Sequence, residues 1–242
     1  MYSRTLFIDS IPKDINILEI GPFYNPQCIG SNVKYFDIID RDALIDRAKQ
    51  IDANIKVENI PYINYISPVG DLSIINETFD AIFSSHAIEH QLDFIDHLQK
   101  TSKLLNNGGK YYLIIPDKRY CFDHFNNEST IADVINANFE KRKKHSLKSV
   151  IEHRALTTHN NSSEHWRGQH GVLDNITERI KNAITEYVTN EYVDVHAFYF
   201  TPASFSQIIS LLNQLGYIDF KINKLHDTPP NNIEFYCVLE KV

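Results

Sequence analysis

The chain contains the stretch Asn16-Ile17-Leu18-Glu19-Ile20-Gly21-Pro22-Phe23-Tyr24-Asn25-Pro26, in which an apolar run with one carboxylate ends in a glycine and two prolines. A short apolar run that turn-forming residues interrupt is typical of a buried strand in an α/β sheet. The loop after such a strand lies at the carboxyl edge of the sheet, where open α/β folds bind ligands. Gly21 has no Cβ, so backbone and ligand can approach closely there. Glu19 is a carboxylate in a buried strand and needs a partner or a function.

The segments that follow alternate between strand-like and helix-like patterns. Apolar runs predict strands, and the stretch near 91–105 predicts a helix because Leu92, Ile95 and Leu98 recur along one face. Asn106-Asn107-Gly108-Gly109 predicts the end of that helix. Such alternation predicts a parallel sheet with helices on both faces. The predicted strands are residues 15–20, 33–37, 63–67, 79–85 and 110–115, and a further helix is predicted at 42–50.

The alternation stops after Pro116. Residues 117–200 contain amphipathic segments near 130–142 and 176–188 but no convincing strand. An insertion after the fifth strand lies over the ligand edge of the sheet, so we predict a mainly helical cap that binds substrate. The predicted organisation is a core formed by 1–116 and 201–242, with 117–200 as the cap.

The last forty residues predict a helix and two strands. Ser204 is the expected N-cap of a helix that continues through Leu215. The strands 217–225 and 233–240 are joined by a segment too short for a helical crossover, so they are predicted to be antiparallel. The fold class predicted is therefore α/β, with a seven-stranded sheet whose last two strands form an antiparallel pair.

Composition narrows the class of protein. The 242 residues include 43% hydrophobic and 12% aromatic residues, which is enough for one domain with an insertion. The formal net charge of −7 argues against a nucleic-acid partner. Three widely separated cysteines predict reduced thiols and a cytoplasmic protein. No signal peptide and no membrane insertion are expected, because the sequence lacks an uncharged apolar run of the required length.

Three strings resemble the class I S-adenosylmethionine-dependent methyltransferase family. Residues 17–21, Ile-Leu-Glu-Ile-Gly, are similar to its first motif, and 79–90 are similar to its fourth-strand motif, which here ends in Glu89-His90. Residues 104–110 resemble the lead into its fifth strand. The order and spacing of the strings make the resemblance more specific than any one of them. It implies a Rossmann-like, doubly wound sheet and S-adenosyl-L-methionine (SAM) as the cofactor.

A narrower resemblance involves residues 115–123, 165–171 and 195–202. These segments are similar to a bacterial methyltransferase-domain group whose members often accompany glycosyltransferases and surface-polysaccharide enzymes. The resemblance favours a glycan or a nucleotide-linked sugar precursor in polysaccharide biosynthesis as the acceptor, and we expect methylation of an oxygen rather than a nitrogen. The implied partners are the small-molecule or glycan acceptor, and a homodimer or a glycosyltransferase.

The family resemblance also implies roles for individual residues. Glu19 and Gly21 would face the methionine end of the cofactor, and Asp37 would accept hydrogen bonds from both ribose hydroxyls. Asp71 with Leu72 would border the adenine, and Ser85 would lie beside the sulfonium. The family's first loop is usually Gly-x-Gly-x-Gly, but Phe23 and Asn25 take the second and third glycine places here.

A hydroxyl acceptor needs a general base, and histidine is the usual choice near neutral pH. We predict His86 as this base, with Asp117 and His153 as the rival candidates. His90 is expected to pin the turn after the fourth strand by hydrogen bonding. The cap also contains His159, His165, His170 and Trp166, which are candidates to contact a substrate. The spacings of the cap histidines do not match a helical metal site, so no metal is predicted.

Two other functions remain open at the level of sequence. The altered glycine loop is compatible with a catalytically weak or inactive methyltransferase-fold scaffold that partners a glycan-assembly enzyme. Asp37 would also suit the adenosine ribose of NAD in an oxidoreductase. However, the chain lacks Gly-x-Gly-x-x-Gly, and that fold does not explain a terminal antiparallel pair.

Overall fold

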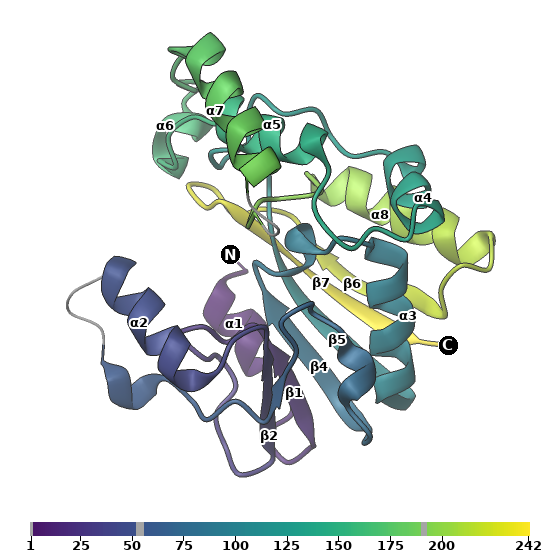
Figure 1. Ribbon diagram of the computed structural model, residues 1–242. Helices are drawn as coiled ribbons and strands as arrows, with labels where there is room; N and C mark the ends of the chain where they lie inside the picture. The colour runs from purple at the N-terminus through teal and green to yellow at the C-terminus, as the bar shows by residue number, and fades with distance from the viewer. Residues whose placement is uncertain (1, 52–55, 190–192) are drawn as a thin grey trace.

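The computed structural model describes residues 2–51, 56–189 and 193–242. One mixed sheet runs through the molecule in the order β3-β2-β1-β4-β5-β7-β6 (Figure 1). The strands are β1 (Ile17–Ile20), β2 (Val33–Asp37), β3 (Tyr65–Ile66), β4 (Phe79–Ser85), β5 (Leu105–Pro116), β6 (Phe220–His226) and β7 (Glu234–Lys241).

The strand directions confirm the predicted fold class. β1 pairs in parallel with β2 and with β4, and β4 pairs in parallel with β5. β7 is antiparallel to both of its neighbours, β5 and β6. The short connection between β6 and β7 allows a hairpin but no crossover, as the sequence indicated.

Helices cover both faces of the sheet. α3 (Phe94–Leu104), α4 (Ile131–Phe139) and α8 (Pro202–Gln214) pack on one face, and α1 (Arg4–Asp9) packs on the other through Phe7. Successive strand residues point to opposite faces of the sheet. Because both faces are buried, the sequences of β1 and β4 are mostly apolar along their length. The other helices are α2 (Arg41–Ile51), α5 (Leu147–Ala155), α6 (Ser162–Trp166) and α7 (Ile176–Thr189), with 3-10 turns η1 (Val57–Asn59), η2 (Leu72–Ile74) and η3 (Ile88–His90).

Two predicted helix caps were wrong, although α3 ends within one residue of the predicted Leu105. α3 ends at Leu104, and Gly108-Gly109 lies inside β5. A Cβ on Gly109 would lie 2.8 Å from the carbonyl oxygen of Asn106, so glycine is needed for an irregular strand rather than for a helix cap. The N-cap of α8 is Thr201, and Ser204 completes a capping box by accepting from the Thr201 backbone N–H at 2.9 Å. The sequence pattern of α8 also fits Pro202 at the first helical position.

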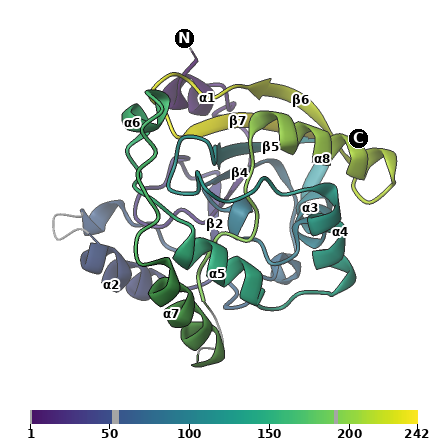
Figure 2. The same ribbon diagram turned by 90° about the horizontal axis from the view of Figure 1, so that it is seen from above.

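The insertion is mainly helical and has two parts. α4 contributes Val134 and Ala137 to the main core and lies against α3 and α8. α5 and α7 pack on each other in a separate small cluster with Val195. Figure 1 shows α5 and α7 above the strands, and the view from above shows α7 to one side of the sheet (Figure 2). None of the described helices is both long and apolar enough to cross a membrane.

Candidate active site

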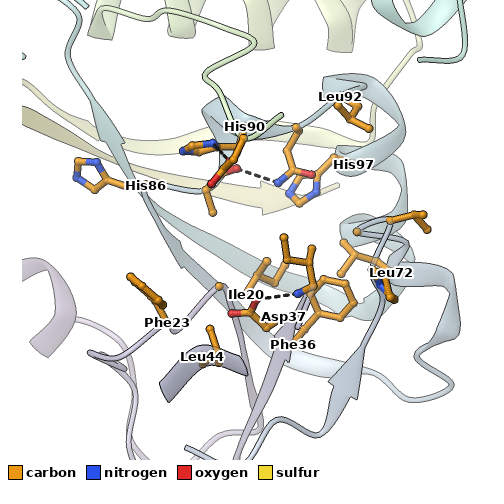
Figure 3. A pocket seen from close by; sticks show the side chains of 18 of the residues that line it. Ile20, Phe23, Phe36, Asp37, Leu44, Leu72, His86, His90, Leu92 and His97 are labelled. Carbon is orange, nitrogen blue, oxygen red and sulfur yellow. Dashed lines mark hydrogen bonds and ion pairs between the residues drawn. The ribbon is translucent and has the colours of Figure 1, made fainter. Parts of the chain in front are cut away.

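A cavity of about 350 Å³ lies at the carboxyl edge of β1, β2 and β4. Its walls come from the loop after β1, the end of β2, residues 68–70 and 72, the segment between β4 and α3, and α2, together with His97 and Asp194. Figure 3 shows Ile20, Phe36 and Asp37 on one side of the space, and His86 and His90 on the other. The position agrees with the rule that open α/β sheets bind ligands beyond their strand ends.

Glu19 shapes the first loop instead of lining the cavity. Its carboxylate accepts hydrogen bonds from the backbone N–H groups of Gln27 and Cys28, both at 2.9 Å. Burial raises the pKa of Glu19 to about 7, although these backbone hydrogen bonds lower it. The carboxylate predicted to face the cofactor amine therefore folds the loop back on β1.

The backbone after β1 is left-handed at two cavity residues. Gly21 has φ 69°, and an added Cβ would lie 3.7 Å from the Cβ of Ala87. Phe23 has φ 45°, a conformation that residues with side chains rarely adopt. Its ring lines the cavity, and the Arg47 guanidinium lies 5.6 Å from the ring centre. Phe23 thus adopts the backbone conformation of a glycine while adding an aromatic wall.

Asp37 lies where the sequence placed it, at the end of β2 and in the cavity wall. One of its carboxylate oxygens accepts from the backbone N–H of Ile38 at 2.7 Å. Burial raises the pKa of Asp37, and hydrogen bonds from the backbone of Ile38, Ile39 and Phe23 oppose this shift. The residue is 8% exposed and forms part of the cavity wall.

Leu72 lines the cavity, whereas its neighbour Asp71 does not. Asp71 caps η2 by accepting from the backbone N–H of Ser73 at 3.0 Å, and it pairs with Lys100 at 2.9 Å. The hydrogen bond from Lys100 and those from Ser73 lower the pKa of Asp71 to about 2. Only Leu72 of this predicted pair contacts the space where the adenine was expected.

Ser85 and His86 end β4 and share a network with the last hairpin. Arg4 donates to the Ser85 hydroxyl at 2.9 Å and to both oxygens of Glu234. His86 lines the cavity with φ 50°, and its Nε2 lies 2.8 Å from Glu234. Burial raises the pKa of Glu234, but the bonds from His86 and Arg4 outweigh it and lower the pKa to about 2. His86 is therefore oriented by an ionised carboxylate. Ser85, by contrast with His86, does not line the cavity.

The other two candidate bases do not line the cavity. Asp117 is fully buried, accepts from Arg119 and from the Thr228 hydroxyl at 2.6 Å, and so holds β5 to the final hairpin. The Nδ1 of His153 accepts from the backbone N–H of His196 at 3.1 Å, and burial lowers the pKa of His153 to about 3. The structure therefore brings Gly21, Asp37, Leu72 and His86 together, and places the other predicted site residues outside the lining.

Sequence reasoning missed a bridge across the top of the cavity. Asp194 accepts from Arg47 on α2 at 2.6 Å and pairs with the Nδ1 of His90 at 3.0 Å. The expectation that His90 pins its own turn was wrong, because its ring reaches this carboxylate 104 residues later. His97 also lines the cavity, and its Nε2 bonds the Tyr111 hydroxyl at 2.9 Å. The only signal for His90 was its place in the fourth-strand motif.

The cap residues that were candidates to contact a substrate are also outside the lining. Trp166 stacks on Tyr120 with ring centres 4.0 Å apart and donates to the backbone oxygen of Asn232. His165 contacts His170 through their Nδ1 atoms at 3.0 Å. His159 bonds the Gln169 carbonyl at 3.1 Å. These side chains hold the cap and the final hairpin together.

Comparisons with known proteins place the fold. No protein-family model and no curated protein matches the sequence. A Listeria monocytogenes protein assigned to the SAM-dependent methyltransferases aligns with a TM-score of 0.50 and 14% identity, over 98% of this chain and 96% of that one. A SAM-dependent methyltransferase from Mesorhizobium loti gives 0.49 and 13%, over 98% and 96%. One from Methanosarcina mazei gives 0.46 and 12%, over 100% and 99%. With its strand order and antiparallel last pair, this chain has the class I methyltransferase fold.

Proposed function

We propose that this protein is a SAM-dependent methyltransferase that acts on an oxygen atom. The observation that carries the proposal is the placement of Gly21 and Asp37 in one cavity beyond β1 and β2. In this fold, the cavity is the expected position of the cofactor. The sequence resemblance supports the same reading independently of the geometry.

The residues present suit the cofactor. A cavity of about 350 Å³ is within the range of sites for small organic ligands. Asp37 supplies carboxylate oxygens for a vicinal diol, and Ile20, Phe36 and Leu72 supply apolar surface. Gly21 supplies a left-handed turn, with φ 69°, in the cavity wall, a conformation that glycine adopts most readily.

His86 is the side chain best placed to accept a proton from a hydroxyl. When bound, the cofactor supplies a methyl group on a positively charged sulfur, so the protein needs mainly to align the acceptor. Because Glu234 accepts from the Nε2 of His86, the lone pair of the neutral ring is on Nδ1. A base oriented by a carboxylate is the arrangement that general-base catalysis uses.

The acceptor we propose is a glycan or a nucleotide-linked sugar precursor, with polysaccharide biosynthesis in the cytoplasm as the context. The resemblance of residues 115–123, 165–171 and 195–202 to glycosyltransferase-associated proteins supports it. A glycosyltransferase or a second copy of the chain would be the protein partner.

In the scaffold alternative, the protein has the methyltransferase fold but does not catalyse methyl transfer. The observation that favours it is Phe23, which has a left-handed backbone conformation at a position where the family usually has glycine. The oxidoreductase alternative has less support, since a mixed sheet ending in β5-β7-β6 differs from the doubly wound dinucleotide fold.

Two measurements separate these functions. Thermal unfolding with SAM, S-adenosylhomocysteine or NAD should give a higher midpoint with the first two compounds only. Mass spectrometry of the denatured protein should detect co-purified S-adenosylhomocysteine. A shift with NAD alone would favour the oxidoreductase. Absence of binding to all three compounds would exclude both enzymes and leave the scaffold.

A further inference from the structure

Glu89 is a buried carboxylate without a hydrogen-bond donor in the described part of the chain. The residue lies in η3, is 1% exposed, and neither side-chain oxygen has a hydrogen-bond partner there. Its ion pairs in the described ranges involve only histidines. Burying a carboxylate without donors is costly, so the arrangement calls for a positive charge beside it.

Three imidazoles surround this carboxylate. The nearest nitrogens of His86 and His90 lie 3.9 Å from Oε1 of Glu89, and Nε2 of His196 lies 3.8 Å from it. These separations are too long for hydrogen bonds. A metal ion about 2.0–2.2 Å from each of two donors holds the donors about 3–4 Å apart. The donor atoms of Glu89, His90 and His196 all lie within 4.8 Å of one another.

The far side of each ligand histidine is occupied by a carboxylate. His90 Nδ1 lies 3.0 Å from Asp194, and His196 Nδ1 lies 2.6 Å from Asp123. An ionised carboxylate can only accept, so both Nδ1 atoms carry the proton and both Nε2 atoms keep a lone pair in the neutral ring. Both Nε2 lone pairs and the Glu89 oxygens are therefore free of hydrogen bonds in the described part of the chain, and these donor atoms lie within 4.8 Å of one another. This carboxylate–histidine arrangement is the one that orients metal-binding histidines.

The segments that carry the donors are tied to each other. The backbone N–H groups of Ala197 and Phe198 both donate to the carbonyl oxygen of Glu89, at 2.7 and 3.2 Å. The ring centres of His90 and His196 are 4.6 Å apart and nearly perpendicular. The segments that carry Glu89 and His196 are thus held together by main-chain hydrogen bonds.

From this geometry we infer that Glu89, His90 and His196 bind a divalent first-row transition-metal ion. Two imidazoles and one carboxylate suit Zn²⁺, Fe²⁺ or Co²⁺ better than Mg²⁺ or Ca²⁺, which prefer oxygen ligands. Three protein ligands leave at least one coordination position open. The sequence prediction of no metal rested on the spacing within 153–170, and none of these three ligands lies there.

The ion would lie beside the cavity wall, because His90 and His86 line the cavity. In that position it would lower the pKa of a hydroxyl that reaches its open coordination position. That role rests on the proposed methyl transfer, whereas the binding of the ion does not.

The test uses the full chain, treated with a chelator and dialysed. Calorimetry with Zn²⁺ alone should give one equivalent of tight binding, and Co²⁺ should give visible absorption typical of nitrogen and oxygen ligands. Glu89→Gln and His196→Asn should each weaken Zn²⁺ binding at least tenfold. Asparagine preserves a donor near the Nδ1 position of His196 and removes only the ligand nitrogen, so it limits damage to folding.

His170→Asn is the matched control, because His124, His165 and His170 form another cluster of metal-binding side chains. Loss of Zn²⁺ binding in this variant, with normal binding in Glu89→Gln and His196→Asn, would overturn the assignment. Absence of stoichiometric binding to wild type would also overturn it, whether or not SAM binds. Binding of SAM without Zn²⁺, or of Zn²⁺ without SAM, separates this inference from the proposed function.

Discussion

His86 Nε2 lies 2.8 Å from the carboxylate of Glu234, a residue 148 positions later in the chain. Arg4 donates to both oxygens of that carboxylate, so α1, the end of β4 and the start of β7 meet at one ion cluster. Only the mixed sheet, with β5 between β4 and β7, brings these segments together.

If His86 accepts the proton, His86→Ala should lower turnover by about 10²–10⁴-fold with little change in SAM affinity. Glu234→Gln should lower turnover less, because the imidazole remains but loses its ionised partner. Single-turnover methyl transfer measures the chemical step directly.

His124→Ala is the control for these variants, since His124 does not line the cavity. Its rate should equal that of wild type. A single-turnover rate within a few-fold of wild type for His86→Ala would exclude His86 as the base. The base would then have to come from another residue, such as one in the cap.

Asp37→Ala should weaken SAM binding by about 1–3 kcal/mol, the range for hydrogen bonds to a charged group. Calorimetry measures the change. Asp219→Ala is the control, because Asp219 is exposed and precedes β6 at the opposite edge of the sheet. Equal affinities for wild type and Asp37→Ala would remove Asp37 from the site.

Glu19 should make stability depend on pH. Its pKa is about 7 in the folded protein against 4.5 for an unperturbed glutamate, so the folded state binds the extra proton between these values. The free energy of unfolding should therefore fall as pH rises from about 4.5 to 7, by on the order of 3 kcal/mol from this group. Urea unfolding at several pH values measures it.

Glu19→Gln should remove that part of the pH dependence, because the amide oxygen still accepts from the loop but carries no charge. The exposed Glu58→Gln should leave the curve unchanged. Parallel stability curves for wild type and Glu19→Gln would contradict the prediction.

The cap should become better protected when the cofactor site is filled. Arg47 lines the cavity and pairs with Asp194, and Arg154 of α5 donates to the backbone oxygen of Asp194 at 3.3 Å. Amide hydrogen exchange with and without S-adenosylhomocysteine should therefore show added protection in residues 153–171, with α8 as an internal reference. Equal, strong protection of 153–171 in both states would indicate a static cap.

The sequence was sufficient for the elements whose signals are local. The apolar run ending at Gly21 predicted β1, and the similar run ending at Ser85 predicted β4. The short link before Glu234 predicted an antiparallel pair. A six-residue helix such as α1 was missed because it is too short for a helical period to be recognised. The Gly108-Gly109 pair was misassigned because glycine marks both a helix end and an irregular strand.

Some of the residues that line the cavity were also predictable to lie near strand ends. Gly21, Asp37 and Leu72 line the cavity because parallel strands deliver their carboxyl ends to one edge. The direction of a side chain was not predictable in the same way. Asp71 pairs with Lys100, Ser85 accepts from Arg4, and Glu19 accepts from the backbone of its own loop. Each of these polar groups contacts a donor that packing brings close to it.

Only the tertiary structure decided which polar groups meet over long separations. Glu89 and His196 are adjacent because the backbone of 197–198 donates to η3, and Asp194 spans the cavity because α2 faces the end of the cap. No periodicity or spacing encodes such contacts. They depend on the strand order and on how the insertion folds back over the sheet, and they form because a buried charged group without a partner is costly in a low-dielectric interior.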